Sequence, residues 1–572
     1  MRLNKKSTTN LIAVMNYSQA FGQAPPKCPI DLLRQYPTDL ILLRISKINA
    51  ILYLQEDMVI QNMRVLKEAI FDGLSATKDI TIQLSALLGR SQQGAFSGPV
   101  MSLIIKEALE NYVPAVSEVT LNAPLFAGDL FKAILAYNEH FYDSSQKPEL
   151  ETFAGLFGLD IQQQYYLRRE SYLKLNTLLK FAFISKFLSE DEKLKGPALE
   201  YCRALQIGTV WGLAKFLLHI FQLVLTGGKE ARHILDRNGA NWPVLEQFVI
   251  RKEDLLSERP LSLHKEIVPK PFYEIDADRL LILDNNYFTF GLDQGVLYSI
   301  FMKTSLRELR IFKSFDTYKG YFGLQYFEQY YVGRFIKNIF SKWNNRVVST
   351  DKYQDYIVKA GNNVFVFEIK MNDFNANGLD KESFSDFKEF IDTKFLQFKQ
   401  GSKSKAKGLA QIIRQIGYLA QDHELMELLD ISGPKKIIIH PIIVYSDANL
   451  DMNGVNEYVN EKVPEHLVQF AGQFQSVRPL VMINGSFFMT YYYLLRKDPA
   501  IFGKWLSAYL KSVNSQKKHY HEEKGPLQYM LYNKSFAEHM RRKIPKEDFG
   551  LNLNVLTADF DLEVKDFGKD FA

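Results

Sequence analysis

The stretch from Tyr353 to Met371, YQDYIVKAGNNVFVFEIKM, constrains the fold more than any other part of the chain. It contains two runs of β-branched and aromatic residues, which are typical of buried strands. Between the runs, Gly361, Asn362 and Asn363 can supply the positive φ angles of a tight turn. The stretch therefore predicts a β-hairpin with two largely buried strands.

The second strand of this hairpin carries two charged residues, Glu368 and Lys370. Because side chains alternate along a strand, both lie on the same face, with Asp355 on the neighbouring strand. Two carboxylates from adjacent strands can hold Mg²⁺ through oxygen, and a nearby lysine can position a water for attack at phosphorus. The alternative interpretation is an ordinary salt bridge at a strand end. The opposite face carries apolar side chains, those of Phe365, Phe367 and Ile369.

Asp355, followed after twelve residues by Glu368-Ile369-Lys370, resembles the D-x(n)-E-x-K signature of the PD-(D/E)XK (restriction-endonuclease-like) nuclease superfamily. The resemblance implies that Asp355 and Glu368 bind Mg²⁺ or Mn²⁺, with the main-chain carbonyl of Ile369 as a further ligand. It also implies that Lys370 positions the attacking water. Gln354 stands where many members of the superfamily have proline.

A helix is predicted over Tyr321–Phe340, and its apolar spacing places Glu328 on the inward face with Leu324 and Tyr331. An isolated inward carboxylate is costly unless it is paired or binds a metal. Pairing with a buried lysine or tyrosine is one interpretation. The other follows from the resemblance, because many superfamily members carry a metal-site Glu on the helix before the first core strand.

Downstream of the hairpin, the chain becomes basic, with six basic residues and no acidic one from Lys394 through Arg414. The loop GSKSKAKG leads into a helix, LAQIIRQIGYLA, whose polar side is predicted to include Gln411. A basic loop beside such a helix suits a phosphate backbone, although a solvated surface loop has the same composition. By the resemblance, Gln411 and Tyr418 are candidate auxiliary residues near the site, in preference to Gln415, and Gln411 is assigned to the catalytic set. The residues predicted to bind nucleic acid are Lys403, Lys405, Lys407, Arg414 and Tyr418.

The predicted fold class is a multidomain α+β protein, since 572 residues exceed what a single core usually supports. Apolar residues recur at helical spacing in the N-terminal half, and further strands are predicted over Ile437–Asp447 and Val477–Asn484. By the resemblance, the second half is a restriction-endonuclease-like core, a mixed central sheet flanked by helices. The predicted parts are an all-helical domain (1–256), a linker with a small hairpin and a helix (257–315), the nuclease-like domain (316–510) and a helical, acidic tail (511–572).

Composition excludes some other classes. The net charge of +5 is too small to indicate a partner for the whole chain, and the two cysteines, Cys28 and Cys202, cannot form a disulfide framework or a cysteine-based metal site. A reducing cytoplasm fits this cysteine usage. The most apolar run, Val210–Leu225, is too short and too interrupted for a membrane span. Six of the ten histidines are predicted to be structural or solvated, namely His140, His219, His233, His440, His519 and His521.

Together these features predict a Mg²⁺- or Mn²⁺-dependent nuclease acting on DNA, in a setting such as restriction, anti-phage defence or repair. The same residues do not distinguish DNA from RNA. The alternative is a non-catalytic helical scaffold whose nuclease-like module binds nucleic acid or a protein. The helical N-terminal domain is compatible with a protein partner.

Overall fold

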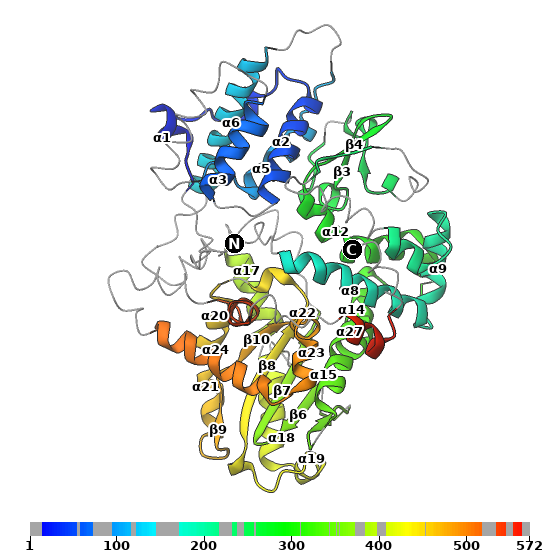
Figure 1. The fold of residues 1–572 in the computed structure, drawn as a ribbon, viewed down its shortest axis with the longest axis vertical. Coiled ribbons are helices and arrows are strands. Elements are labelled where there is room, and N and C mark those ends of the chain that lie inside the picture. Colours follow the sequence, from blue (N-terminus) through cyan, green and yellow to red (C-terminus); the bar gives the residue numbers. More distant parts are fainter. Residues whose placement is uncertain are drawn as a thin grey trace. The chain divides into compact units, whose positions relative to one another are not determined.

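The structure is a computed structural model in which the chain divides into two compact units (Figure 1). Unit 1 contains residues 1–148, 166–181 and 192–306, and unit 2 contains residues 149–165, 182–191 and 307–572. The structure describes residues 14–53, 58–72, 94–115, 122–144, 171–216, 232–236, 245–256, 259–308, 310–342, 344–350, 352–353, 355–371, 384–396, 408–451, 453–517, 534–544 and 553–562.

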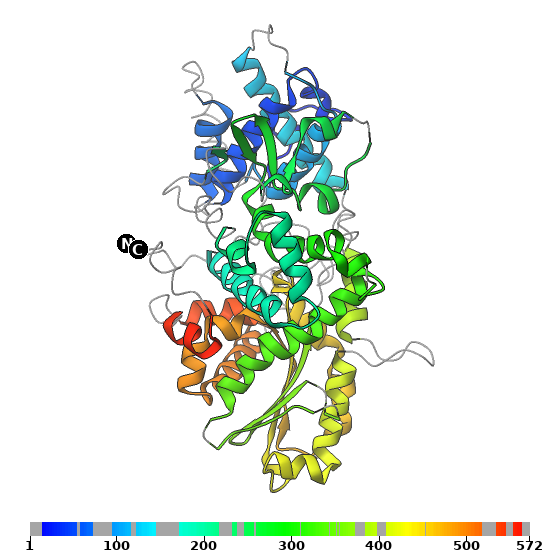
Figure 2. The ribbon, with the colours of Figure 1, turned by 90° about the vertical axis from the view of Figure 1, so that its right-hand side faces the viewer.

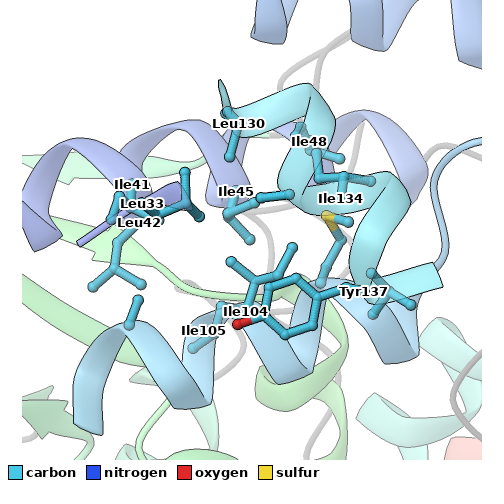
Figure 3. Packing of buried hydrophobic residues seen from close by; sticks show 14 of the residues in the cluster. Leu33, Ile41, Leu42, Ile45, Ile48, Ile104, Ile105, Leu130, Ile134 and Tyr137 are labelled. Atoms are coloured by element: carbon cyan, nitrogen blue, oxygen red, sulfur yellow. The ribbon is translucent and has the colours of Figure 1, made fainter. Parts of the chain in front are cut away.

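Unit 1 is built around three packed helices, α2 (Thr38–Tyr53), α5 (Gly98–Glu110) and α6 (Ala123–Ser144). Their apolar residues recur every three or four positions and meet in one buried cluster (Figure 3). The helical spacing in the sequence predicted all three. The unit also contains α1 (Tyr17–Phe21), η1 (Pro29–Leu32), α3 (Met58–Arg64), η2 (Val65–Ile70), α9 (Lys195–Ala204), η4 (Lys252–Leu255), η5 (Leu263–Ile267) and α12 (Asn285–Lys303). The short helix α13 (Ser305–Glu308) is divided between the two units.

A four-stranded sheet in unit 1 corrects the prediction of an all-helical segment over residues 1–256. The strand order is β1-β4-β3-β2, so the sheet also crosses the boundary predicted at residue 256. The first two strands are only three and two residues long, too short to give a recognisable alternation. The strands are β1 (Ile234–Asp236), β2 (Val249–Ile250), β3 (Phe272–Asp276) and β4 (Arg279–Ile282).

The apolar run at residues 280–283 and the aromatic run at residues 287–290 predict the two strands of the small hairpin in the linker. A hairpin exists, but residues 280–282 pair with β3 upstream, and residues 287–290 lie in α12. The side chain of Asp284 accepts a hydrogen bond from the N–H of Asn286 and so caps the start of this helix. The sequence Asp-Asn-Asn is typical of a turn, but here its first residue is a helix cap.

Unit 2 contains a mixed sheet in which an antiparallel meander continues into parallel strands. Its order is β10-β8-β7-β6-β5, and β9 pairs with the start of β8. Along the chain, the elements run helix, three antiparallel strands, helix and parallel strand. The strands are β5 (Arg346–Val348), β6 (Tyr356–Ala360), β7 (Asn363–Lys370), β8 (Ile438–Tyr445), β9 (Ser476–Val477) and β10 (Val481–Asn484).

The predicted hairpin is formed by β6 and β7. Ala360 pairs with Asn363, so only Gly361 and Asn362 form the connection. Gly361 has a φ of 60°, a conformation that glycine adopts without steric cost. A two-residue turn fixes the register of the pair, and the register decides which face of β7 carries each side chain.

Helices cover both faces of this sheet (Figure 2). On one face, Phe340 of α15 (Gly333–Phe340) and Phe502 of α24 (Ile501–Lys517) lie against Phe365 of β7. On the other face lies α18 (Leu409–Gln421), which packs on β7 and β8. The remaining elements are α14 (Phe315–Phe322), η6 (Gly323–Val332), α17 (Phe384–Ile391), η7 (Asp392–Leu396), α19 (His423–Leu428), η8 (Pro434–Lys436), η9 (Ala448–Asp451), α20 (Val455–Lys462), α21 (Pro464–Leu467), η10 (Val468–Phe470), α22 (Ser486–Thr490) and α23 (Tyr492–Lys497), with α8 (Ser171–Glu190) divided between the units.

The segment predicted as a separate tail contributes to the core of unit 2. Phe536 on α26 (Phe536–Lys543) lies 5.0 Å, ring centroid to ring centroid, from Phe487. Phe560 on α27 (Leu553–Phe560) lies 4.4 Å from Phe335 in the same measure. The boundary predicted at residue 510 is therefore wrong, because α24 runs through it. The protein has a mixed α+β fold with helices predominating in the N-terminal part.

Candidate functional site

The carboxyl end of β7 places a buried glutamate beside a lysine. Glu368 is only 1% exposed, and its Oε1 forms an ion pair with Nζ of Lys370. The two residues are two positions apart in one strand, so their side chains share a face, as the alternation predicted. The Lys370 side chain remains 22% exposed. The buried carboxylate of Glu368 is thus paired with a lysine side chain that is partly exposed to solvent.

Asp355 joins this pair from the residue just before β6. Its φ of 56° is unusual for a residue other than glycine, although Asp tolerates this region better than most. The Oδ2 atom of Asp355 accepts a hydrogen bond of 2.6 Å from the main-chain N–H of Ile369. This bond anchors the Asp355 carboxylate at the residue that lies between Glu368 and Lys370 in the neighbouring strand.

Glu328 reaches the same place from η6, which is a π-helix. The N–H of Gly333 donates to the carbonyl of Glu328 five residues earlier, the bond that defines this wider helix. Of the residues predicted to face inward, Tyr331 is buried as expected, but Leu324 is 44% exposed. Such π-helical turns occur frequently at functional sites.

The three carboxyl groups influence one another strongly. Burial raises the pKa of Glu328, and the charge of Asp355 and a hydrogen bond to it raise the pKa further. Burial likewise raises the pKa of Glu368, with Asp355 adding to the effect and Lys370 opposing it. For Lys370, burial opposes the charged amine, but the carboxylates of Glu368 and Asp355 outweigh burial and raise the pKa. Burial and mutual repulsion therefore make Glu328 and Glu368 keep their protons to a higher pH than exposed glutamates do.

Gly333 lets Tyr356 of β6 pack against the helix that carries Glu328. A Cβ atom at position 333 would lie 2.1 Å from the Tyr356 hydroxyl oxygen and 2.8 Å from the Glu328 carbonyl oxygen. Both contacts are shorter than atoms can approach without bonding, so a larger residue would displace the helix. The glycine thus sets the distance between Glu328 and the sheet.

We expect Gly333→Ala to destabilise the protein by about 1–3 kcal/mol, as overpacking of a tight core does. Gly320→Ala in α14 is the matched control, because nothing lies within 4 Å of a Cβ there. The control should leave stability unchanged or raise it by up to about 1 kcal/mol. Urea unfolding of both variants measures the difference, and equal stabilities would contradict the packing described for Gly333.

A polar clamp holds the segment that leads to Asp355. Lys352 Nζ lies 3.0 Å from Asp422 Oδ2 and 2.7 Å from Glu424 Oε2. The buried Tyr353 donates its hydroxyl to Asp422 Oδ2 at 3.0 Å, and its ring meets that of Tyr418 edge-on. The clamp therefore joins the residues just before Asp355 to the end of α18 and the start of α19.

The buried side of α18 differs from the predicted one. Gln411, expected on the polar side, is only 8% exposed, and its Oε1 accepts a hydrogen bond from the N–H of Gly408. Gln415 is 1% exposed, and neither atom of its amide has a hydrogen-bond partner among the described residues. Arg414 is exposed and Tyr418 is half-buried. The helix packs against two strands, so its buried face is wide enough to include Gln411 and Gln415, which lie four residues apart.

Three of the predicted nucleic-acid-binding residues, Lys403, Lys405 and Lys407, lie outside the described residues. Two of the histidines predicted to be structural or solvated form polar contacts in the structure. His140 Nε2 lies 2.7 Å from the Pro26 carbonyl oxygen, and His440 Nε2 lies 2.9 Å from Asn363 Oδ1. Burial lowers the pKa of His233 and of His440 to about 4. His219, His519 and His521 lie outside the described part of the chain.

The cluster offers hard oxygen donors, the type that Mg²⁺ and Mn²⁺ prefer. As the side chains stand, however, no three His, Cys, Asp or Glu side chains in the described part of the chain are grouped so as to hold a metal ion. One Asp355 oxygen is bound to Ile369, and Glu368 is paired with Lys370. Metal binding would therefore require two shifts. The Lys370 amine would have to move away from Glu368, and the Glu328 carboxyl group would have to lose its proton. The donor types fit a divalent ion once these shifts occur.

Comparisons of the chain with protein-family models, with curated proteins and with solved structures found no match. Within the described residues, none of the helices has the length and apolar character needed to cross a membrane. The side-chain arrangement at the end of β7 is therefore the basis for assigning a function.

Proposed function

We propose that the protein is a divalent-metal-dependent nuclease that cleaves phosphodiester bonds in DNA. The proposal is carried by one observation: Glu328, Asp355, Glu368 and Lys370, from three elements, interact with one another at the carboxyl end of β7. The order of helix, three antiparallel strands, helix and parallel strand supports it as well. So does the resemblance of the D-x(n)-E-x-K pattern to the PD-(D/E)XK nucleases.

Asp355, Glu368 and Glu328 would hold Mg²⁺ or Mn²⁺, with the Ile369 carbonyl as a further ligand. When bound, the ion would polarise the phosphate and stabilise the charge that develops on it. The raised pKa values of Glu328 and Glu368 support this role, because the three carboxyl groups repel one another once they lose their protons. A divalent cation could take the place of those protons and neutralise the charge of the carboxylates.

Lys370 would position the attacking water and stabilise the developing negative charge once it leaves Glu368. Its amine is both charged and partly open to solvent, so it can meet a phosphate at the site. Gln411 has a structural partner in Gly408. An auxiliary role on this helix therefore suits Gln415 better, because its buried amide is unpartnered among the described residues. Arg414 and Tyr418, with the basic loop before them, would contact the DNA backbone.

A non-catalytic nucleic-acid-binding module is the second candidate. The ion pair between Glu368 and Lys370 favours it, because this pair satisfies the buried carboxylate without a metal. A single assay distinguishes the two candidate functions. Labelled single-stranded DNA, duplex DNA and RNA are incubated with the purified full-length chain in Mg²⁺, in Mn²⁺ and in EDTA. We expect DNA cleavage with either metal and none in EDTA. Binding without cleavage in every metal would favour the second candidate.

A further inference from the structure

Unit 2 contains a groove with a cavity volume of about 370 Å³ between α24 and the segment that leads into β10. The helix α24 is orange in Figure 1. Ser507, Lys511 and Asn514 lie along the groove on α24, spaced by four and three residues and hence on one face of the helix. Arg478 lines the opposite wall, at the break between β9 and β10. Its main-chain N–H donates to the Ile439 carbonyl at 2.9 Å, which fixes the position of this wall.

The groove is positively charged. Arg478 and Lys511 are both exposed, and neither forms an ion pair with an acidic side chain among the described residues. Other cations in this unit are paired, for example Arg496 with Asp559 at 2.8 Å and Lys462 with Asp392 at 3.1 Å. No acidic residue lines the groove within the described part of the chain. An anion would therefore meet two uncompensated positive charges.

The lining is specific enough to indicate a class of anion. The planar guanidinium of Arg478 can donate to two oxygens of one phosphate, and the Lys511 ammonium adds a second positive charge. The Ser507 hydroxyl and the Asn514 amide are further hydrogen-bond donors. The volume lies within the range of small-molecule sites and exceeds what a phosphate alone needs. Pro479 and Leu510 give the remaining space apolar walls. We propose that this groove binds a small phosphorylated molecule through its phosphate group.

This site is separate from the carboxylate cluster. Arg478 is bonded to Ile439 near the start of β8, whereas Glu368 pairs with Ile443 further along that strand. Four residues of strand correspond to about 13 Å. Binding in the groove therefore does not depend on the proposed nuclease function.

Isothermal titration of the full-length chain in EDTA tests the proposal, with AMP, inorganic phosphate and adenosine as probes. We expect saturable binding of AMP, at least as tight as that of inorganic phosphate, and no saturable binding of adenosine. Arg478→Gln and Lys511→Gln should each weaken AMP binding about tenfold or more, since each removes a charge-assisted contact. Lys504→Gln is the matched control, because Lys504 is an exposed lysine of the same helix outside the groove.

Thermal unfolding of the three variants confirms that each is folded, as expected for exposed positions. The proposal is overturned if AMP does not bind saturably or if adenosine binds as tightly as AMP. It is also overturned if Lys504→Gln weakens AMP binding as much as the two groove variants do.

Discussion

Replacing Glu368 by glutamine should lower the rate of DNA cleavage by about a thousandfold, which corresponds to about 4 kcal/mol of transition-state stabilisation. Glutamine keeps the volume of the buried side chain but removes the charge that would hold the metal. Lys370→Met should have an effect of similar size, because it removes the amine and keeps the aliphatic stem. Single-turnover cleavage of labelled DNA in Mn²⁺ measures both rates.

Lys388 and Glu389 are consecutive exposed residues of α17, and they provide matched controls. Glu389→Gln and Lys388→Met make the same chemical changes away from the cluster, so both should cleave DNA at rates close to that of the unchanged protein. The variants at 368 and 370 should remain folded, which far-UV circular dichroism checks. If Glu368→Gln and Lys370→Met retain full activity, the cluster does not carry the chemistry.

Without metal, the carboxylate cluster should make the protein less stable as pH rises from about 5 toward 9. The folded-state pKa values of Glu328 and Glu368 lie above the ordinary glutamate value of 4.5, so folding takes up protons in this range. The stability that these two groups contribute is present at low pH and is lost as pH rises through their folded-state pKa values. A tenfold difference in proton affinity between the folded and unfolded states corresponds to about 1.4 kcal/mol.

Asp355, Lys370 and Tyr356 face these two glutamates, and other groups in the chain also titrate. His233 and His440 have lowered pKa values and change stability in the opposite direction between about pH 4 and 6.5. The comparison is therefore between the unchanged protein and Glu328→Gln/Glu368→Gln, which removes only the contribution of the cluster. Urea unfolding in EDTA at several pH values should give a stability difference that grows in favour of the variant as pH rises.

Adding Mn²⁺ should reverse this effect in the unchanged protein. A ligand at one hundred times its dissociation constant stabilises the folded state by about 2.7 kcal/mol. Because the carboxyl groups must lose protons to bind a cation, the stabilisation should increase with pH. The double glutamine variant should gain little. A metal effect that is independent of pH, or equal in the two proteins, would contradict the proposed linkage.

The sequence was most informative where a residue pattern depends on one strand alone. The alternation along Asn363–Lys370 correctly placed Glu368 and Lys370 on one face, and the glycine-asparagine turn correctly predicted the hairpin. Side chains two residues apart in a strand share a face whatever packs against them. The nearness of Asp355 followed from pairing the two strands.

Prediction was less successful where tertiary packing decides. The π-helix at Gly323–Val332 was not predicted, because its inserted turn depends on packing. Leu324 was placed inward, but it is exposed. Gln411 was placed on the polar side, although α18 is buried over a wider face than its aliphatic residues suggest. Two features could have signalled this: the i, i+4 spacing of Gln411 and Gln415, and their position beside Ile412 and Ile416.

The short strands of unit 1 and the helices after residue 510 show the same limit. Strands of two or three residues carry no measurable period, so residues 234–250 were assigned to a helical segment. The helices α26 and α27 are held in the core of unit 2 by aromatic contacts with residues far away in the chain. Such long-range contacts leave no local pattern from which a domain boundary can be placed.

The most direct test of the central claim is anomalous X-ray diffraction from crystals of the protein grown with Mn²⁺. We expect an anomalous peak about 2–2.5 Å from carboxylate oxygens of Asp355 and Glu368, with the Lys370 amine moved away from Glu368. Metal binding by the cluster is contradicted if, at Mn²⁺ concentrations that saturate cleavage, Lys370 still pairs with Glu368 and no peak lies within bonding distance of Asp355.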